Sequence, residues 1–314
     1  MKNAIVFPGQ GSQSVGMGLE LAKNFAVARQ VFDEVNDALN QNLSEIMFNG
    51  PEEELTLTEN AQPAIMAASI AVLRVLEAET GFNPASYGSY FAGHSLGEYT
   101  AFAAANTFSL ADTARLLKLR GQEMQMAVPV GQGAMAAILG LDYNDVAEIV
   151  SEAGDVGICA IANDNSPGQI VVSGKIKAVQ KAAELAKVKG AKRSVMLPVS
   201  APFHSPMMQP AAFAMKLALD TTKMNTPSLP IISNVTAKPV SDVNEIRKLL
   251  VEQVTGMVRW RESVEYLAAA GVTSILEIGF GKILTGLVKR IDKNINATCV
   301  SGAEDVFSFL KEAA

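Results

Sequence analysis

The pentapeptide Gly93–Gly97 (Gly-His-Ser-Leu-Gly) restricts the fold of this chain more than any other segment. It matches the G-x-S-x-G pattern, in which a serine stands on a sharp turn between a strand and a helix. The neighbouring residues supply both elements, because Tyr90–Ala92 is predicted to be a strand and Leu96–Ala105 a helix. We therefore favour a nucleophile turn over a purely structural one. Such a turn belongs at the end of a strand in an α/β sheet.

Short apolar runs alternate with longer helical patterns over the rest of the chain, and this alternation predicts a mostly parallel sheet covered on both faces. The expected strands include Ala4–Phe7, Ile231-Ile232 and Ser274–Ile278. The expected helices include patterns around Met17–Leu39, Pro63–Glu79 and Pro210–Leu219, where Pro63 suits a first helical position.

The middle of the chain has a different order of elements. Strands are predicted at Ala134–Leu139, Gly157–Ala162, Gln169–Val172 and Ser194–Val199, with helices at Tyr143–Ala153 and Lys175–Lys189 and a turn at 163–168. The order β-α-β-β-α-β is the ferredoxin-like unit. We expect residues 128–198 to form a ferredoxin-like small subdomain inserted into a large α/β-hydrolase-like domain made of 1–127 and 199–314.

Composition excludes several classes of protein. The net charge of −6 argues against binding to nucleic acid. The most apolar run, Ala61–Leu73, is shorter than the roughly 20 residues of a membrane span, and a single basic residue at Lys2 does not make a signal peptide. No Cys/His cluster has metal-ligand spacing, and Cys159 and Cys299 are expected to be free thiols. These features predict a cytoplasmic protein without a metal.

A serine hydroxyl needs a base within hydrogen-bond reach, and the chain has two histidines. His94 adjoins Ser95 on the tight turn, where neighbouring side chains diverge. His204, in the proline-flanked loop 200–206, is therefore the favoured base. No acidic residue stands out as its partner: Asp164, Asp220 and Asp242 are possible on spacing, and an amide or a backbone carbonyl could orient the histidine instead.

One segment departs from the acidic composition. Between Lys175 and Arg193 there are seven basic residues and one acidic residue, Glu184. This pattern is typical of a solvated helix face, and it also suits a dock for an acidic partner.

Several short segments form a recognisable set in this order and spacing: Phe7–Gln13 (Phe-Pro-Gly-Gln-Gly-Ser-Gln), Gln62-Pro63-Ala64, Gly93–Glu98, Arg120-Gly121, Asn163, Pro202-Phe203-His204 and Glu277-Ile278-Gly279. On these residues the chain resembles, nearly end to end, the malonyl-CoA:acyl carrier protein transacylases and the related acyltransferase domains of fatty acid and polyketide synthases. It departs from the common pattern at Phe280, where family members often have proline.

The resemblance implies a reaction in which Ser95, with His204 as base, takes a malonyl group from malonyl-CoA and passes it to the phosphopantetheine thiol of an acyl carrier protein. Coenzyme A would enter as part of the substrate, and no cofactor would be needed. Because carrier proteins of this family are acidic, the interpretation of the basic segment as their dock becomes as favoured as its interpretation as a solvated helix face. A start at Met1 without fused neighbours favours a discrete enzyme of fatty acid synthesis.

The resemblance also assigns roles to residues that spacing does not single out. The oxyanion hole would be the backbone N–H groups of Gln10 and Leu96, and Gln253 would be the partner of His204. Arg120 would hold the malonyl carboxylate, because its planar fork binds a carboxylate with two hydrogen bonds. Phe203 would crowd a 2-methyl branch. The substrate site would further include Asn163 and Gln62.

Three alternatives remain open at this point. A serine thioesterase or esterase could use the same turn, although Arg120 and the Gln10 loop argue against it. A non-catalytic scaffold could bind carrier proteins, but both Ser95 and His204 are present. The same chemistry could serve polyketide synthesis as an acyltransferase acting in trans.

Overall fold

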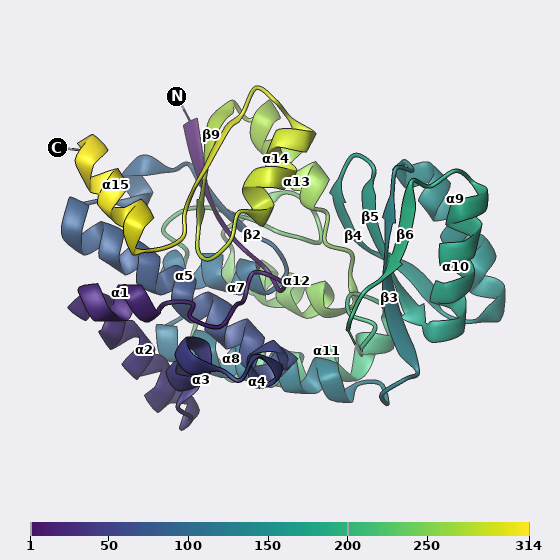
Figure 1. Ribbon diagram of the computed structural model, residues 1–314, viewed down its shortest axis with the longest axis horizontal. Helices are drawn as coiled ribbons and strands as arrows, with labels where there is room; N and C mark the ends of the chain where they lie inside the picture. The colour runs from purple at the N-terminus through teal and green to yellow at the C-terminus, as the bar shows by residue number, and fades with distance from the viewer. Residues whose placement is uncertain (1, 200, 314) are drawn as a thin grey trace.

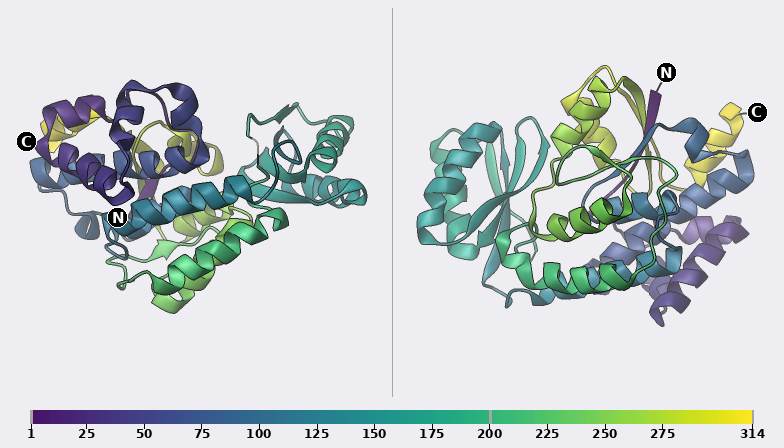
Figure 2. Two further views of the ribbon diagram at one scale, coloured as in Figure 1. Left: turned by 90° about the horizontal axis from the view of Figure 1, so that it is seen from below. Right: turned by 180° about the vertical axis from the view of Figure 1, so that it is seen from behind.

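The computed structural model describes residues 2–199 and 201–313. Met1 and Ala314, at the ends of the predicted large domain, and Ser200, in the loop before His204, lie outside the described residues. The chain forms two sheets, a larger one near both termini and a smaller one set to one side (Figure 1). Figure 2 shows the smaller sheet and its helices projecting from the larger body in both further views.

The larger sheet has the strand order β10-β9-β1-β2-β7-β8. Its strands are β1 (Lys2–Phe7), β2 (Tyr90–Gly93), β7 (Ile231–Ile232), β8 (Pro239–Val240), β9 (Val272–Ile278) and β10 (Asn296–Val300). All neighbouring pairs are parallel except β7 and β8, which are antiparallel. The carboxyl ends of β1 and β2 therefore lie side by side, with Phe7 in register with Gly93.

Helices cover both faces of this sheet because successive side chains of a strand point to opposite faces. In β1, Ile5 and Phe7 join one large hydrophobic cluster, and Ala4 and Val6 join another. The helices of the first cluster are α1 (Leu19–Asn24), α2 (Ala26–Leu39), α3 (Leu43–Asn49), α4 (Glu52–Thr56), α5 (Thr58–Thr80), α7 (Leu96–Ala104), α8 (Leu110–Met126), α11 (Gln209–Thr221), α12 (Val243–Thr255) and α15 (Ala303–Ala313). Those of the second cluster are α13 (Trp260–Ala269) and α14 (Ile283–Ile291).

Helix α5 is the central helix of the first cluster. Among the described residues it alone is long and apolar enough, by length and composition, to cross a membrane, but 83% of its apolar window is buried inside the molecule. It is therefore a core helix. Short helical turns complete this part of the chain: α6 (Pro84–Tyr87) and a 3-10 turn at Pro206–Met208.

The smaller sheet is antiparallel and has the order β4-β5-β3-β6. Its elements follow one another as β3 (Gly133–Leu139), α9 (Tyr143–Ala153), a 3-10 turn (Gly154–Val156), β4 (Cys159–Ser166), β5 (Gln169–Lys175), α10 (Ile176–Val188) and β6 (Arg193–Met196). This confirms the predicted βαββαβ order beside a parallel α/β sheet. One face packs on α9 and α10, and Met135 and Val171 on the other face join the core of the larger part.

The two sheets are joined along β4. Val258, just before α13, donates its N–H to the carbonyl of Ala162, and its own carbonyl accepts from the N–H of Asp164. The Asp164 carboxylate accepts from Nε and Nη2 of Arg261 at 3.0 and 2.8 Å. These contacts hold strand β4 against Val258 and helix α13, which precedes strand β9 of the larger sheet.

Three local expectations were wrong or incomplete. The turn predicted at 163–168 is much shorter, because β4 continues to Ser166 and leaves only Pro167-Gly168 to turn the chain. Pro63 is not a first helical position, since α5 begins at Thr58. The pattern at Met17–Leu39 is two helices that meet at the extended residue Phe25.

Candidate active site

Ser95 stands at the turn between β2 and α7 in a conformation that non-glycine residues rarely adopt, with φ 54° and ψ −110°. The glycines beside it are required by close packing. A Cβ on Gly93 would lie 1.9 Å from the carbonyl oxygen of Gly97, and one on Gly97 would lie 2.3 Å from that of Phe7. Neither backbone atom could move aside without disturbing the strand-to-helix connection. The turn therefore has the tight geometry that the sequence pattern predicts.

The Ser95 hydroxyl and the His204 imidazole are in direct contact. Ser95 Oγ lies 2.7 Å from His204 Nε2, although the two residues are 109 positions apart. The other ring nitrogen, Nδ1, faces the carbonyl oxygens of Gln253 at 2.9 Å and Gly256 at 3.1 Å. Because carbonyl oxygens only accept, Nδ1 carries the proton and Nε2 is free to accept the hydrogen of the serine hydroxyl. This arrangement suits a base and a nucleophile.

Gln253 makes its contact with His204 through the backbone carbonyl, not through the side chain. Its side-chain amide contacts four other groups, one of them Asn234 Oδ1, to which Nε2 donates at 3.4 Å. Oε1 accepts from Arg120 Nη2 at 2.9 Å, and Nε2 donates to the Ser95 carbonyl at 2.8 Å and to Glu98 Oε2 at 2.7 Å. Of the candidate partners considered from sequence, the structure therefore places a backbone carbonyl at the histidine. Asp164 lies instead in the contact with Arg261.

Arg120 is buried at the Ser95 hydroxyl, with only 1% of its surface exposed. It lies within α8, its guanidinium carbon is 5.6 Å from the centre of the Tyr99 ring, and Nη1 donates to Gln62 Oε1 at 2.8 Å. Nη2 donates to Ser95 Oγ at 3.2 Å. Within residues 2–199 and 201–313, Arg120 forms no ion pair, and its Nε has no hydrogen-bond partner. A buried cation without a direct anionic partner is suited to an anionic ligand.

The buried surroundings shift the pKa values of two neighbouring groups. Burial, with the added effect of the Arg120 charge, lowers the pKa of the His204 imidazole to about 3. Burial raises the pKa of the Glu98 carboxyl to about 7, against the hydrogen bond from Gln253. His204 is therefore neutral at ordinary pH, which is the state that can take a proton from Ser95.

A cavity of about 390 Å³ lies between the two sheets and opens onto Ser95 and His204. His94 also lines it, as do five predicted site residues: Gln10, Gln62, Arg120, Asn163 and Phe203. Met124, Met135, Leu197 and Val199 give it an apolar side. A separate cavity of about 500 Å³, between α1 and α15, contains none of these residues.

The two remaining predicted site residues, Leu96 and Gln253, adjoin Ser95. Leu96 is the first residue of α7, where the backbone N–H has no partner within the helix. In the part of the chain that the structure describes, neither this N–H nor that of Gln10 donates to a backbone carbonyl in a loop or turn. Gln253 lies fully buried behind Ser95.

The sequence assigned no role to three buried polar residues that contact the turn. Asn165 Oδ1 lies 2.8 Å from His94 Nε2 and holds this histidine away from the Ser95 hydroxyl. Behind Ser95, Glu98 Oε2 accepts from the backbone N–H of Asn234 and from Gln253 Nε2. A signal existed for Asn234, because it follows the predicted strand Ile231-Ile232, and parallel strands end at the same edge of a sheet.

Comparison with known proteins agrees with this fold and site. A family model described as the acyl transferase domain matches residues 4–305. The chain therefore belongs to the acyl transferase domain family and is an acyltransferase.

The relatives specify the group within that family. The chain is 45% identical over 306 residues to the malonyl CoA-acyl carrier protein transacylase of Bacillus subtilis, covering 97% of this chain and 95% of that one. It is 43% identical over 298 residues to the enzyme of the same name from Escherichia coli K12, with 95% of each covered.

Solved structures agree with these relatives. The acyl-carrier-protein-S-malonyltransferase of Bartonella henselae is 56% identical, with a TM-score of 0.97 and coverage of 100% of this chain and 99% of that one. A malonyl-transacylase in complex with its type II PKS acyl-carrier protein is 41% identical, with a TM-score of 0.95 and coverage of 99% and 100%.

Proposed function

We propose that this enzyme transfers a malonyl group from malonyl-CoA to the phosphopantetheine thiol of an acyl carrier protein, through a malonyl ester of Ser95. One observation carries the proposal: the Ser95 hydroxyl contacts a neutral imidazole at 2.7 Å and a buried guanidinium at 3.2 Å. The first contact supplies a base for the nucleophile. The second supplies a site for a carboxylate beside the reacting carbonyl. The names of the relatives support malonyl-CoA and the carrier protein as substrates.

In the first half of the reaction, Ser95 Oγ attacks the thioester carbonyl of malonyl-CoA, and its proton passes to His204 Nε2. The backbone N–H groups of Gln10 and Leu96 bind the negative oxygen that forms. The C–S bond then breaks, and the coenzyme A sulfur takes the proton from His204. In the second half, His204 removes the proton of the carrier-protein thiol, which attacks the ester carbonyl. The C–O bond to Ser95 then breaks, and Ser95 Oγ takes the proton back from His204 Nε2. The carbonyls of Gln253 and Gly256 hold the imidazole through both halves.

The substrate's own carboxylate helps the base in this mechanism. Burial is the largest cause that lowers the pKa of His204, and the Arg120 charge adds to it. A malonyl carboxylate bound to Arg120 offsets that charge, so the contribution of Arg120 to the lowered pKa of His204 is smaller when the site is occupied. His204 is then a stronger base with malonyl-CoA bound than with an uncharged acyl-CoA.

Replacing Arg120 by alanine should reduce malonyl transfer by about 10²-fold or more, because the loss of a charged, buried partner costs several kcal/mol. Acetyl transfer should fall much less, so the ratio of kcat/KM values should move towards acetyl-CoA. Competition between the two acyl-CoAs measures this ratio, and Arg120→Lys tests whether the two-pronged geometry is needed. Equal losses for both substrates would contradict the assignment of Arg120 to the carboxylate.

Three further residues line the substrate cavity. Phe203 narrows the space around the acyl group, and Asn163 and Gln62 complete its polar side, with Gln62 also holding Arg120.

We take 128–198 as the small subdomain, with 1–127 and 199–314 as the large domain, and the cavity between them as the substrate cleft. The enzyme acts in the cytoplasm, needs no cofactor, and supplies malonyl groups to fatty acid synthesis.

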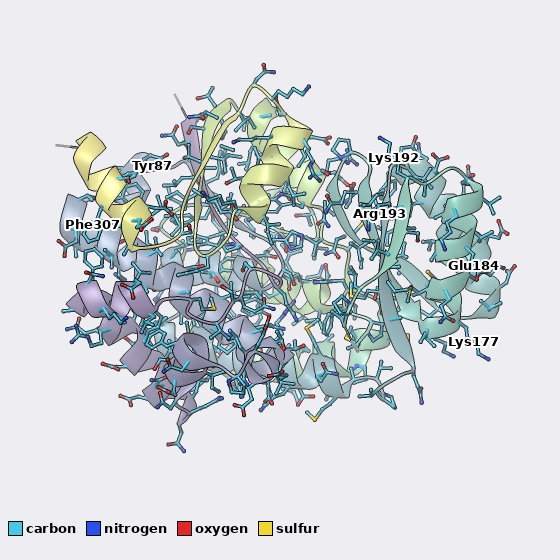
Figure 3. All side chains as sticks on the ribbon, in the orientation of Figure 1. Tyr87, Lys177, Glu184, Lys192, Arg193 and Phe307 are labelled. Carbon is cyan, nitrogen blue, oxygen red and sulfur yellow. The ribbon has the colours of Figure 1, made fainter. Side chains whose placement is uncertain are left out.

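The basic segment is the proposed dock for the acidic carrier protein. Its residues extend over the outer helix α10 and the start of β6, and Figure 3 shows Lys177 and Glu184 at the outer edge of the molecule and Lys192 and Arg193 on the side of the larger sheet. Lys189 already pairs with Glu148 of α9, and Lys181 with Asp155. Arg193, at the start of β6, is exposed.

Reversing the charge of both Lys189 and Arg193 to glutamate should raise the KM for carrier protein several-fold and leave the KM for malonyl-CoA unchanged. The control is Lys23→Glu with Arg74→Glu, which changes the net charge equally on α1 and α5, far from β6, and also breaks exposed ion pairs. Steady-state kinetics with each substrate varied separately give both KM values. An unchanged KM for carrier protein would show that this segment is only a solvated face.

Release of coenzyme A thiol from malonyl-CoA, with and without carrier protein, tests the proposed function itself. The proposal predicts one fast turnover per enzyme and then a rate that depends on carrier protein. Sustained release that is indifferent to carrier protein would identify a hydrolase instead. Comparing carrier proteins of fatty acid and polyketide synthesis as acceptors then tests the proposed pathway.

A further inference from the structure

The side chain of Asn234 bridges two backbone groups of the nucleophile turn. Its Oδ1 accepts from the Ser95 N–H at 2.7 Å, and its Nδ2 donates to the Gly93 carbonyl at 2.7 Å. The orientation of the amide is fixed by these partners, since an N–H only donates and a carbonyl only accepts. Asn234 is fully buried and does not line the substrate cavity. Its Oδ1 also accepts from Gln253 Nε2 at 3.4 Å. Its side-chain contacts are therefore with the turn and with Gln253, and not with substrate.

Asn234 is itself held in place from two sides. Its backbone N–H donates to Glu98 Oε2 at 3.3 Å, and its carbonyl accepts from the N–H of Arg259 at 2.9 Å. It follows β7, the neighbour of β2 in the sheet, so the bridge connects the ends of two adjacent strands. This support is rigid because both strands belong to the core.

The turn needs such support because Ser95 has a positive φ of 54°, which is unfavourable for a residue with a side chain. Asn234 holds the peptide group before Ser95, and Gln253 Nε2 holds the Ser95 carbonyl after it at 2.8 Å. With both peptide groups fixed, the Cα–Cβ bond points the hydroxyl at His204 Nε2. Without Asn234, the Ser95 N–H and the buried Gly93 carbonyl lose these hydrogen bonds, and the turn is free to relax.

We propose that Asn234 is a positioning residue for the reaction, which holds the strained Ser95 backbone so that its hydroxyl meets His204. This inference rests on the proposed role of Ser95 as nucleophile. It assigns Asn234 to the formation of the malonyl ester and not to the binding of malonyl-CoA. The expected signature is therefore a loss in the rate of Ser95 acylation with little change in substrate affinity.

Asn234→Ala should slow the single-turnover malonylation of Ser95 by about 10- to 100-fold, because a small misplacement of a reacting atom costs up to that much. The KM for malonyl-CoA should change less than about twofold. Rapid quenching followed by intact-mass measurement gives the acylation rate. The control is Asn60→Ala, which removes another buried asparagine that bonds Gln41, Glu54 and Lys118, none of which lines the cavity.

Asn234→Asp tests the same role in a variant that keeps the shape of the side chain. A protonated aspartic acid can donate to the Gly93 carbonyl and accept from Ser95, as asparagine does, whereas the carboxylate repels that carbonyl. Burial beside Glu98 raises the pKa of the new carboxyl, and Arg120 acts against this shift. His94 and His204, the other titratable groups near the turn, are common to both proteins.

The ratio of the Asn234→Asp acylation rate to that of the wild type, taken in the same buffers, cancels the titration of these shared groups. It should rise on the order of fivefold between pH 8.5 and pH 6, as the new carboxyl gains its proton. A ratio that falls over the same pH range, or an Asn234→Ala rate no lower than that of Asn60→Ala, would overturn the positioning role even though the wild type is acylated. Failure of the wild type to form the malonyl ester would instead overturn the proposed function.

Discussion

Replacement of Ser95 by alanine is expected to abolish malonyl transfer, with a loss of about 10³-fold or more, because the ester cannot form without the hydroxyl. The fold should persist, since the hydroxyl contacts only the side chains of His204 and Arg120 in the described hydrogen bonds. The rate of malonyl-carrier-protein formation measures the loss, and a thermal melt verifies the fold.

Ser69→Ala is the matched control for this change. Ser69 is a fully buried serine in α5, and its hydroxyl has no hydrogen-bond partner among the described residues. It should keep wild-type activity. Transfer by Ser95→Ala at more than a few per cent of the wild-type rate would contradict the role of Ser95.

Replacement of His204 by alanine should reduce kcat by about 10²- to 10⁴-fold, the range that a general base contributes. The effect is expected on acylation and on transfer to carrier protein, since the proposed mechanism uses His204 in both halves. His94→Ala should cost less, because His94 is bonded to Asn165 and not to Ser95. Stopped-flow measurement of each half-reaction gives the two losses, and the opposite ranking would show that the base has been misassigned.

The lowered pKa of His204 also predicts how kcat/KM depends on pH. Because the pKa of His204 is lowered to about 3, the free enzyme keeps a neutral base well below the ordinary histidine range. The profile of kcat/KM for the wild type should therefore show no loss from histidine protonation near pH 6.5.

The elements near Ser95 could be predicted because their signals are local. Strand, turn and helix are adjacent in sequence at 90–104, and the glycines that the turn needs are part of the pattern. The ferredoxin-like unit could also be predicted, because its apolar residues recur every two residues in the strands and about every 3.6 residues in the helices. The end of β4 could not be predicted, because Asn163, Asp164 and Asn165 are residue types typical of turns. Tertiary contacts with Val258, Arg261 and His94 hold these residues in a strand.

The electrostatics of the site could not be derived from local pattern. Arg120 follows a leucine-rich helical run, and its burial depends on Gln62 and Tyr99 from two other helices. The resemblance pointed to Gln253 as the partner of His204, but only the fold shows that its backbone makes the contact and its amide joins Arg120 to Glu98. The contact of Asn234 with the nucleophile turn could not be predicted without the order of the strands, which places β7 beside β2.

The central claim is that a malonyl group passes through Ser95. The most direct test is the intact mass of the wild-type protein after brief exposure to malonyl-CoA, followed by the addition of carrier protein. The account predicts a gain of one malonyl group, located on the peptide that contains Ser95 and lost to the carrier protein within one turnover. A protein that transfers malonyl groups without ever gaining this mass, or that carries it on another residue, would contradict the account.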